Sequence, residues 1–155
     1  MYNIDTVCVY CGGASQVDGA YRKAAEELGS AIAAKGWNLV CGGNIGIMGA
    51  IAKSVIERGG KVTIVIPEDL KKRELENDWA TEMIVAGSMH ERKITMVKRS
   101  QAFVILPGGL GTLDEFFELI TWRQLGFHDK PVILANIGGY WDRLLSLVDG
   151  IIEAG

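Results

Sequence analysis

The stretch AFVILPGGLGTLDE, residues 102–115, joins an apolar run to a glycine-rich turn and an acidic, helix-like segment. The apolar run lacks the alternation of polar and apolar side chains that a half-exposed strand shows, so it predicts a strand covered on both faces. Comparable runs occur at residues 6–10, 38–41, 62–66, 82–86 and 132–135, and we expect residues 102–106 to form the fifth of six strands.

Helical patterns fill the intervals between these strands. In the first, Tyr21, Leu28 and Ile32 recur at helical spacing, and Gly36 follows its end. The other helical patterns cover roughly residues 46–58, 89–101, 112–126 and 140–154. Strands and helices in alternation predict an α/β fold, a doubly wound parallel sheet with helices on both faces. The length of 155 residues suits a single domain, 1–155.

Composition and charge exclude several classes of protein. The chain is 48% hydrophobic and 23% charged, and its net charge is −3, with lysine and arginine spread out rather than gathered into the basic stripe of a nucleic-acid binder. Its apolar runs are far shorter than the ~20 residues of a membrane span. The N-terminus enters a strand-like run without a signal segment. We therefore expect a cytoplasmic protein that binds neither nucleic acid nor membrane.

The cysteines and histidines do not predict redox or metal chemistry. Cys8 and Cys11 form a C-x-x-C pair, but Cys8 lies inside a strand-like run rather than at the start of a helix, which indicates packing. His90 and His128 do not belong to a metal-ligand cluster, so we expect no zinc site. We expect His90 to be a packed helix residue rather than a base.

Glycines gather where three of the predicted strands end, at residues 11–13, 41–49 and 107–111. In such sheets, ligands bind at the carboxyl ends of the strands. Glycine lets backbone N–H groups approach a ligand closely, and a helix N-terminus adds positive potential. Two of these loops each open a helix, which favours a phosphate-bearing ligand. The long polar connection 67–80 is expected to be a partly helical loop over this site.

A nicotinamide dinucleotide enzyme is a weaker alternative. The spacing Gly43-x-x-Gly46-x-x-Gly49 differs from G-x-G-x-x-G, and the acids nearest the required position, Glu68 and Asp69, lie beyond the end of the next strand. A P-loop is excluded because the sequence contains no G-K-[ST].

Two acids, Asp114 and Glu115, follow the last glycine loop directly. Thr112-x-x-Glu115 has the form of a capping box, and both carboxylates suit the positive end of a helix, at ~0.3–1 kcal/mol each. Spacing alone leaves capping and catalysis equally open for Glu115. Ser88-x-x-Glu91 has the same form at the start of the neighbouring helix.

Arg92 shares a predicted helix face with Met89 and Met96. An arginine on an otherwise apolar face needs an anionic partner or an open cleft. The alternative is a solvated arginine on the helix surface.

Together these segments resemble the Lonely Guy family of cytokinin riboside 5′-monophosphate phosphoribohydrolases, often mislabelled as lysine decarboxylases. The motifs that carry the resemblance are Met89-His90-Glu91-Arg92-Lys93 and Pro107-Gly108-Gly109-Leu110-Gly111-Thr112-Leu113-Asp114-Glu115. It continues through Val9-Tyr10-Cys11-Gly12, Gly46-Ile47-Met48-Gly49, Thr121-Trp122, Gln124-Leu125-Gly126, His128-Asp129-Lys130-Pro131 and Gly139-Tyr140. Nothing in the sequence marks a pyridoxal-phosphate lysine, so we discount lysine decarboxylation.

The resemblance implies a Rossmann-like fold, usually dimeric, that cleaves the N-glycosidic bond of a nucleoside monophosphate into free base and ribose 5-phosphate, with no cofactor or metal. The family's essential arginine and glutamate fall on Arg92 and Glu115. The candidate substrate contacts, from the resemblance and the glycine loops, are Gly42, Gly43, Glu74, Met89, Lys93, Gly108, Gly109, Leu110, Gly111, Thr112, Leu113, Asp114 and Thr121.

These roles form one hypothesis. The glycine loop and helix start hold the 5′-phosphate through backbone N–H groups, while Glu115 faces the ribose. There a carboxylate stabilises the positive charge that develops and orients or deprotonates the attacking water. Arg92 holds the phosphate or the ribose hydroxyls and keeps Glu115 ionised. Asp114 caps the helix or supports the site.

Departures from the family leave the substrate open. Cys11-Gly12-Gly13-Ala14 stands where the family often has Cys-Gly-Ser-Ser, and Gly42-Gly43-Asn44 stands for a three-glycine run in a shorter loop. The base is N6-substituted adenine or plain adenine, and a nucleotide-binding or cofactor-carrier protein without turnover is the alternative. The chain ends at Gly155 directly after a helix, so a truncated chain and a lost terminal strand both stay open.

The predicted helix 112–126 is apolar on two faces. Phe116 and Ile120 lie on one face, and Leu119 and Trp122 lie on the other. Such a helix is fully buried or lies at a subunit contact. With the family precedent, we expect a homodimer that uses this helix.

Overall fold

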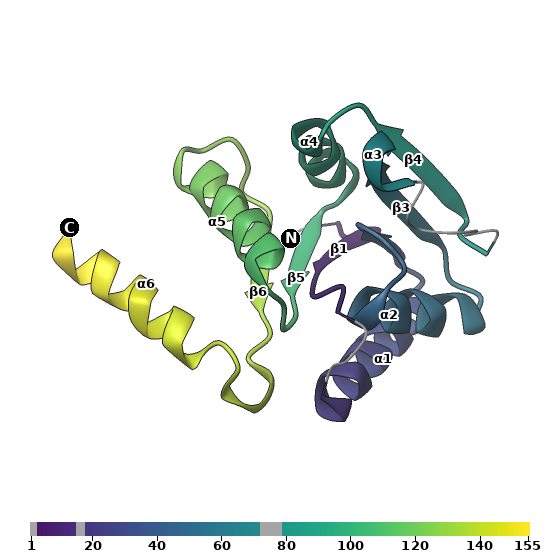
Figure 1. Ribbon diagram of the computed structural model, residues 1–155, viewed down its shortest axis with the longest axis horizontal. Helices are drawn as coiled ribbons and strands as arrows, with labels where there is room; N and C mark the ends of the chain where they lie inside the picture. Colours follow the sequence, from purple (N-terminus) through teal and green to yellow (C-terminus); the bar gives the residue numbers. More distant parts are fainter. Residues whose placement is uncertain (1–2, 15–17, 72–78) are drawn as a thin grey trace.

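In the part of the chain that the computed structural model describes, residues 3–14, 18–71 and 79–155, six strands form one parallel sheet. The strands are β1 (Thr6–Tyr10), β2 (Asn38–Cys41), β3 (Val62–Pro67), β4 (Glu82–Ala86), β5 (Ala102–Ile105) and β6 (Val132–Leu134). They lie in the order β4-β3-β2-β1-β5-β6, and each neighbouring pair is parallel (Figure 1). The predicted α/β fold is confirmed, and every strand ends within one residue of its expected bounds.

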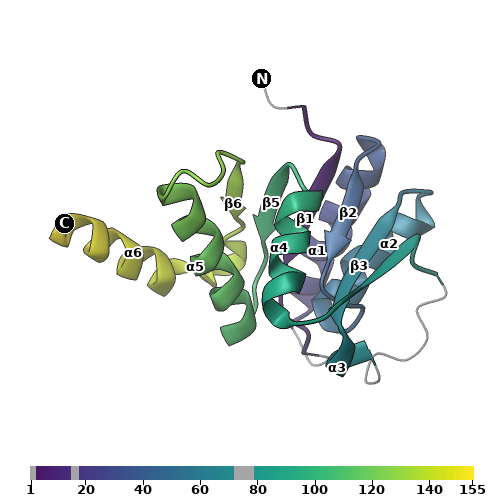
Figure 2. The same ribbon diagram turned by 90° about the horizontal axis from the view of Figure 1, so that it is seen from above.

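Helices cover both faces of this sheet. The helices of the described residues are α1 (Gly19–Ala34), α2 (Gly46–Glu57), α3 (Glu68–Lys71), α4 (Met89–Arg99), α5 (Leu110–Gln124), the short 3-10 helix η1 (Ile137–Gly139) and α6 (Asp142–Ala154). Helices α1 and α2 pack on one face, and α4 and α5 pack on the other (Figure 2). The doubly wound arrangement expected from the sequence is therefore present.

Strand β1 shows why the residues that follow Thr6 in it are apolar. Val7 and Val9 pack with α1 and α2, whereas Cys8 and Tyr10 pack with α4 and α5. All four side chains are buried. Because both faces of the strand are covered, a polar residue at any of these positions would be buried without water.

The order of the strands reverses on either side of β1. The chain proceeds outward from β1 through β2, β3 and β4, and then returns to place β5 on the other side of β1. A crevice for ligands forms at the carboxyl ends of the strands at such a point. Here the loop after β1 touches the loop after β5, because the Gly12 N–H donates to the Pro107 carbonyl at 3.0 Å. The glycine loops after β1 and β5 thus form one edge of the crevice.

Helix α6 lies apart from the sheet. It runs away from the rest of the molecule in both views (Figures 1 and 2), and none of its residues, all of them described, is buried. Leu147, Ile151 and Ile152 on this helix are 56%, 58% and 71% exposed. On α5, Phe116 is buried while Leu110 is 86% exposed. The C-terminal part of the chain therefore carries an uncovered apolar surface.

The polar connection 67–80 begins with α3, which agrees with the expected helical content. Residues 72–78, which include the candidate contact Glu74, lie outside the described residues. Among the residues that are described, no helix is both long and apolar enough to cross a membrane.

Candidate active site

A buried ion pair joins α4 to α5. Arg92 and Glu115 are 7% and 9% exposed, and the Arg92 Nη1 donates to the Glu115 Oε1 at 2.8 Å. The Arg92 Nε also donates to the Val65 carbonyl on β3 at 3.0 Å. The expected anionic partner of Arg92 is thus present, and the alternative of a solvated arginine is wrong.

Gly42 provides the space that the Arg92 side chain occupies. Gly42 is buried directly after β2, and a Cβ built on it would overlap the guanidinium Nη2. The neighbouring Gly43 is also buried, and its carbonyl accepts a hydrogen bond from the Cys41 Sγ at 3.3 Å. Gly42 therefore supports the arginine, and a direct contact of either glycine with substrate stays a prediction.

Helix α5 begins two residues before its predicted start. Gly109 is the N-cap, in an extended conformation, and no described side chain caps the helix. Thr112 therefore lies within the first turn, and Glu115 bonds to Arg92 rather than reaching back to a cap. The capping-box interpretation of Thr112 and Glu115 is wrong because the glycine N-cap moves the helix start.

At the start of α4, the cap predicted from Ser88 and Glu91 is confirmed. The Ser88 Oγ accepts from the Glu91 N–H at 3.1 Å and caps the helix. The Glu91 Oε2 accepts from the Gly87 N–H at 2.7 Å, one residue before the position that a standard capping box uses. The start of α4, and with it Arg92, is therefore fixed by local hydrogen bonds.

The first turn of α5 faces open space. Because no described side chain caps it, the amides of Leu110, Gly111 and Thr112 keep the partial positive charge of a helix start. No described atom beyond the adjacent backbone lies within 4 Å of a Cβ built on Gly109 or Gly111. A Cβ on Gly108 would instead overlap the Thr112 Oγ1. Gly108 thus allows tight packing of the loop, while Gly109 and Gly111 leave room for an anion.

Burial is the largest influence on the pKa of Glu115 and raises it above its ordinary value. The charge and the hydrogen bond of Arg92 lower this pKa, as expected, but they do not overcome the loss of hydration. Arg92 therefore favours the ionised form of Glu115, as predicted, against the larger opposing effect of burial. The pair contains a carboxylate whose affinity for a proton is above normal, which suits a general base.

Lys93 links α4 to α5 a second time. It is 5% exposed, and its Nζ donates to the Asp114 Oδ2 at 3.0 Å and to the Glu118 Oε2 at 3.1 Å. Desolvation lowers the pKa of Lys93, but these hydrogen bonds and charges outweigh it, so the pKa lies above its ordinary value. Lys93 is therefore a fixed cation that Asp114 supports. A contact between Lys93 and substrate stays a prediction.

The other candidate residues are spread along α4 and α5. Met89, at the start of α4, is 46% exposed. Leu113 lies on α5 and packs against the hydrophobic core. Thr121 is exposed and lies six residues after Glu115, ~9 Å further along the helix. Within one chain, the fold does not bring Thr121 to the Arg92–Glu115 pair.

His90 is exposed, so its expected packed position is wrong. The buried positions of α4 are Arg92, Lys93 and Met96, and His90 lies away from them on the helix. The sequence did not predict two contacts of the site. The Val65 carbonyl accepts from Arg92, and the Tyr140 hydroxyl donates to the Gly108 carbonyl at 2.7 Å. The motif Gly139-Tyr140 was the one signal that could have pointed to the second.

The cysteines have the environment that packing predicts. Cys8 and Cys11 are 0% and 6% exposed and carry free thiols. Burial raises the pKa of both thiols well above the ordinary value, so neither is a reactive thiolate at neutral pH. Within the described ranges, no group of three or more His, Cys, Asp or Glu side chains could hold a metal ion.

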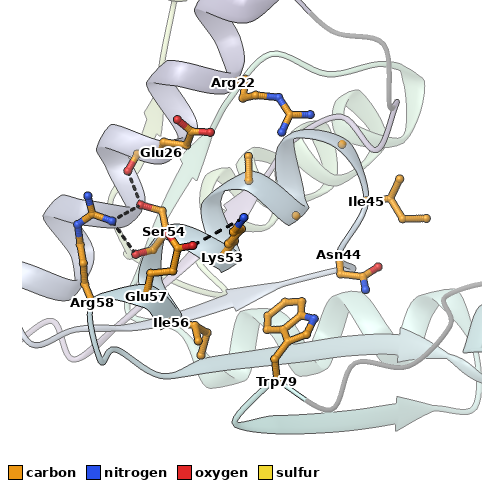
Figure 3. A pocket seen from close by; sticks show the side chains of 13 residues that line it. Arg22, Glu26, Asn44, Ile45, Lys53, Ser54, Ile56, Glu57, Arg58 and Trp79 are labelled. Carbon is orange, nitrogen blue, oxygen red and sulfur yellow. Dashed lines mark hydrogen bonds and ion pairs between the residues drawn. The ribbon is translucent and has the colours of Figure 1, made fainter.

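A cavity of about 970 Å³ lies apart from the ion pair, between α1, α2 and Trp79. Figure 3 shows Trp79 on the opposite side of this cavity from Arg22 and Glu26. Among the described residues, neither Arg92 nor Glu115 lines it. We therefore base the chemistry on the ion pair and the glycine loop rather than on the size of this cavity.

Comparison with known proteins identifies the family. The family profile described as "Possible lysine decarboxylase" matches residues 48–155. The chain is 45% identical over 150 residues to the cytokinin riboside 5′-monophosphate phosphoribohydrolase LOG1 of Arabidopsis thaliana. It is 49% identical over 150 residues to the probable cytokinin riboside 5′-monophosphate phosphoribohydrolase LOGL9 of Oryza sativa subsp. japonica. The chain belongs to the Lonely Guy family.

The two relatives differ from the chain in length. Each alignment covers 96% of the chain, but 70% of the Arabidopsis protein and 66% of the rice protein. Among solved structures, the molybdenum cofactor carrier protein of Chlamydomonas reinhardtii matches with a TM-score of 0.75 at 25% identity. That match covers 96% of the chain and 86% of the carrier. The Lonely Guy fold is thus shared with proteins named as carriers.

Proposed function

We propose that this protein hydrolyses the N-glycosidic bond of a purine nucleoside 5′-monophosphate and releases the free base and ribose 5-phosphate. The observation that carries the proposal is the buried Arg92–Glu115 pair next to the open start of α5. The reaction itself is the one in the names of the relatives at 45% and 49% identity.

The spacing along α5 supports this assignment. Glu115 follows Leu110 by five residues, which places it roughly 7.5 Å along the helix axis. The distance from an anion held by the first-turn amides to the Glu115 carboxylate is therefore about the length of one small sugar. A ribose 5-phosphate unit has a phosphate at one end and the reacting carbon at the other, so it matches the two ends of this arrangement.

Glu115 has two tasks in the proposed reaction. As the bond between C1′ and the base breaks, positive charge develops on the sugar, and the nearby carboxylate stabilises it. The raised pKa of Glu115 also makes the carboxylate a better base toward the attacking water. Water supplies a hydroxyl to C1′, and the base leaves with a proton, so atoms and charge balance.

Arg92 holds Glu115 in place for this chemistry. Its Nε and Nη1 are already bonded to the Val65 carbonyl and to Glu115, and its Nη2 lies against Gly42. The guanidinium is therefore fixed in position before substrate arrives. Its remaining N–H groups are available to a phosphate or ribose oxygen.

The identity of the base is part of the proposal. The names of the relatives specify a cytokinin riboside 5′-monophosphate, which favours an N6-substituted adenine. The replacement of two hydroxyl side chains by Gly13 and Ala14 beside the crevice alters the nucleotide site, so plain adenine, and with it AMP nucleosidase activity, is the second candidate base.

A carrier protein without turnover is the second candidate function. The likeness to the molybdenum cofactor carrier, with a TM-score of 0.75, favours it, because the same glycine loops can hold a phosphate without cleaving anything. The lysine decarboxylase description is not favoured, since a Schiff-base lysine needs a lowered pKa and Lys93, the lysine next to the ion pair, has a raised one. Burial lowers the pKa of Lys130, but its Nζ donates to the Val97 carbonyl near the end of α4.

The proposal includes a cytoplasmic homodimer. Helix α5, the helix expected at the subunit contact, exposes Leu110, and α6 exposes Leu147, Ile151 and Ile152, apolar side chains that a second copy would cover. The free thiols of Cys8 and Cys11 suit a reducing compartment. Light scattering at micromolar concentration should give twice the chain mass, and a monomer mass would contradict the dimer.

Incubation of the purified protein with AMP and with isopentenyladenosine 5′-monophosphate, followed by chromatography, tests the reaction. Free base should appear from at least one nucleotide and disappear with the Glu115→Gln variant, and the two rates rank the bases. Retained nucleotide without free base from either would instead support the carrier.

A further inference from the structure

Two hydrogen bonds fix the backbone carbonyl groups of Pro107 and Gly108 in the glycine loop after β5. The Pro107 carbonyl accepts from the Gly12 N–H at 3.0 Å, and the Gly108 carbonyl accepts from the Tyr140 Oη at 2.7 Å. Gly12 comes from the loop after β1, and Tyr140 comes from the connection between η1 and α6. Segments far apart in the sequence thus hold two consecutive peptide groups of one loop.

These bonds determine the direction of the loop amides. In a trans peptide the carbonyl and the following N–H point in opposite directions. With the Pro107 carbonyl directed at Gly12, the Gly108 N–H points away from Gly12. With the Gly108 carbonyl directed at Tyr140, the Gly109 N–H points away from Tyr140. A Cβ built on Gly109 would meet no described atom within 4 Å beyond the adjacent backbone, so the surroundings of this residue are open.

The segment that carries Tyr140 is itself held in place. The Asn136 Oδ1 accepts from the Trp141 N–H at 2.7 Å, and the Asn136 Nδ2 donates to the Asp142 Oδ1 at 2.6 Å. The preceding residues Gly138 and Gly139 have φ of 59° and 77°, a backbone conformation that favours glycine. The hydroxyl is therefore delivered by a defined turn, although Tyr140 is 41% exposed.

The Tyr140 ring is packed on two sides. Its centroid lies 5.3 Å from that of Tyr21 on α1 and 4.7 Å from that of Trp141, both edge to face. Removal of the hydroxyl alone leaves this packing in place. The hydroxyl therefore has an effect that can be separated from that of the ring.

We propose that Tyr140 is a positioning residue for the phosphate of the substrate, because its hydroxyl holds the Gly108 carbonyl and so aims the Gly109 N–H at the phosphate. The inference rests on the proposed function of the site. The hydrogen bond also polarises the Gly108–Gly109 peptide group, which strengthens its N–H as a donor to an anion. Tyr140 acts through the backbone and does not touch the substrate.

The experiment compares Tyr140→Phe with Tyr21→Phe, which removes a hydroxyl from the neighbouring ring. Base release from the better nucleotide is measured with ribose 5-phosphate as competitive inhibitor, and adenosine binding is measured by calorimetry. In Tyr140→Phe, KM and the inhibition constant of ribose 5-phosphate should both rise, roughly five- to tenfold for the loss of one hydrogen bond. The kcat should stay within about twofold, and adenosine binding should be unchanged because adenosine has no phosphate.

The outcomes distinguish this inference from the proposed function. Unchanged KM and inhibition by ribose 5-phosphate in Tyr140→Phe, or equal changes in Tyr21→Phe, would overturn the role of Tyr140. A fall in adenosine binding of the same size would show a general structural role, which also overturns it. If the wild-type protein releases no base, the proposed reaction fails, and calorimetry with ribose 5-phosphate still tests Tyr140 directly.

Discussion

The replacement of Gly42 by alanine should disable the Arg92–Glu115 pair without touching either charged residue. The added methyl group would overlap the Arg92 Nη2, so the guanidinium must move. The hydrogen bonds of the guanidinium to Glu115 at 2.8 Å and to the Val65 carbonyl at 3.0 Å both depend on its present position. The backbone at Gly42 cannot easily yield instead, because Gly42 directly follows β2, a central strand of the sheet.

The size of the effect follows from the bond to Glu115. A hydrogen bond to a charged group contributes about 1.5–3 kcal/mol, so we expect a loss of stability of that order. If the same contact is lost in the transition state, the catalytic rate should fall about 10- to 100-fold, since 1.36 kcal/mol corresponds to a factor of ten. A Glu115 carboxyl that Arg92 pairs less well should also have a pKa raised further above its already raised value.

The assay is the pH dependence of kcat for base release, together with urea denaturation. Activity should rise with pH as Glu115 loses its proton, and in Gly42→Ala this rise should move to higher pH. Gly19→Ala is the matched control, because Gly19 lies at the start of α1 and no described atom beyond the adjacent backbone lies within 4 Å of its added Cβ. A Gly42→Ala enzyme with wild-type kcat and an unshifted acid limb would refute the reasoning.

Two further predictions concern the acids and the lysine. Lys93→Met removes the cation between Asp114 and Glu118; because these acids are 60% and 26% exposed in their side chains, stability should fall by ~1–2 kcal/mol in urea denaturation rather than by the full cost of a buried pair. An unchanged urea midpoint would contradict this. The folded-state pKa of Glu115 lies above its ordinary 4.5, so its contribution to stability is largest below that pH and is lost as pH rises through the raised folded value. The free energy of unfolding of the wild type, relative to that of Glu115→Gln, should therefore fall with rising pH in that window. A rise would show a lowered pKa.

The fold could be predicted closely because the signals for it are local. After Thr6, the run that forms β1 is apolar, as is the whole of β5, and glycine or proline follows each of them within two residues. Coverage of both faces removes the need for alternation, so these runs are recognisable without knowledge of their neighbours. The bounds of every strand were predicted to within one residue.

The helix starts were less predictable because two signals competed. Thr112 and Glu115 have the spacing of a capping box, but Gly109 takes the N-cap in an extended conformation and the helix begins at Leu110. Ser88 and Glu91 have the same spacing and do cap their helix. The sequence pattern alone does not separate these two cases, because the outcome depends on which residue takes the N-cap position.

The details of the site depend on contacts between distant segments. That Arg92 would need an anionic partner followed from its apolar helix face, and Glu115 is that partner. That Gly42 makes room for the guanidinium, and that the Val65 carbonyl holds its Nε, required the relative positions of β2, β3 and α4. Backbone groups leave no trace in residue identity, so no motif could have revealed these contacts.

The central claim, that Glu115 cleaves a nucleotide held by the glycine loop, is tested most directly by measuring binding and cleavage in the same pair of proteins. Calorimetry with AMP and with isopentenyladenosine 5′-monophosphate should give Glu115→Gln a Kd within about fivefold of wild type, while base release falls by roughly 10²- to 10⁴-fold, the range expected for the loss of a general base. Base release by Glu115→Gln at the wild-type rate, or tight nucleotide binding by the wild type with no base released, would contradict the account.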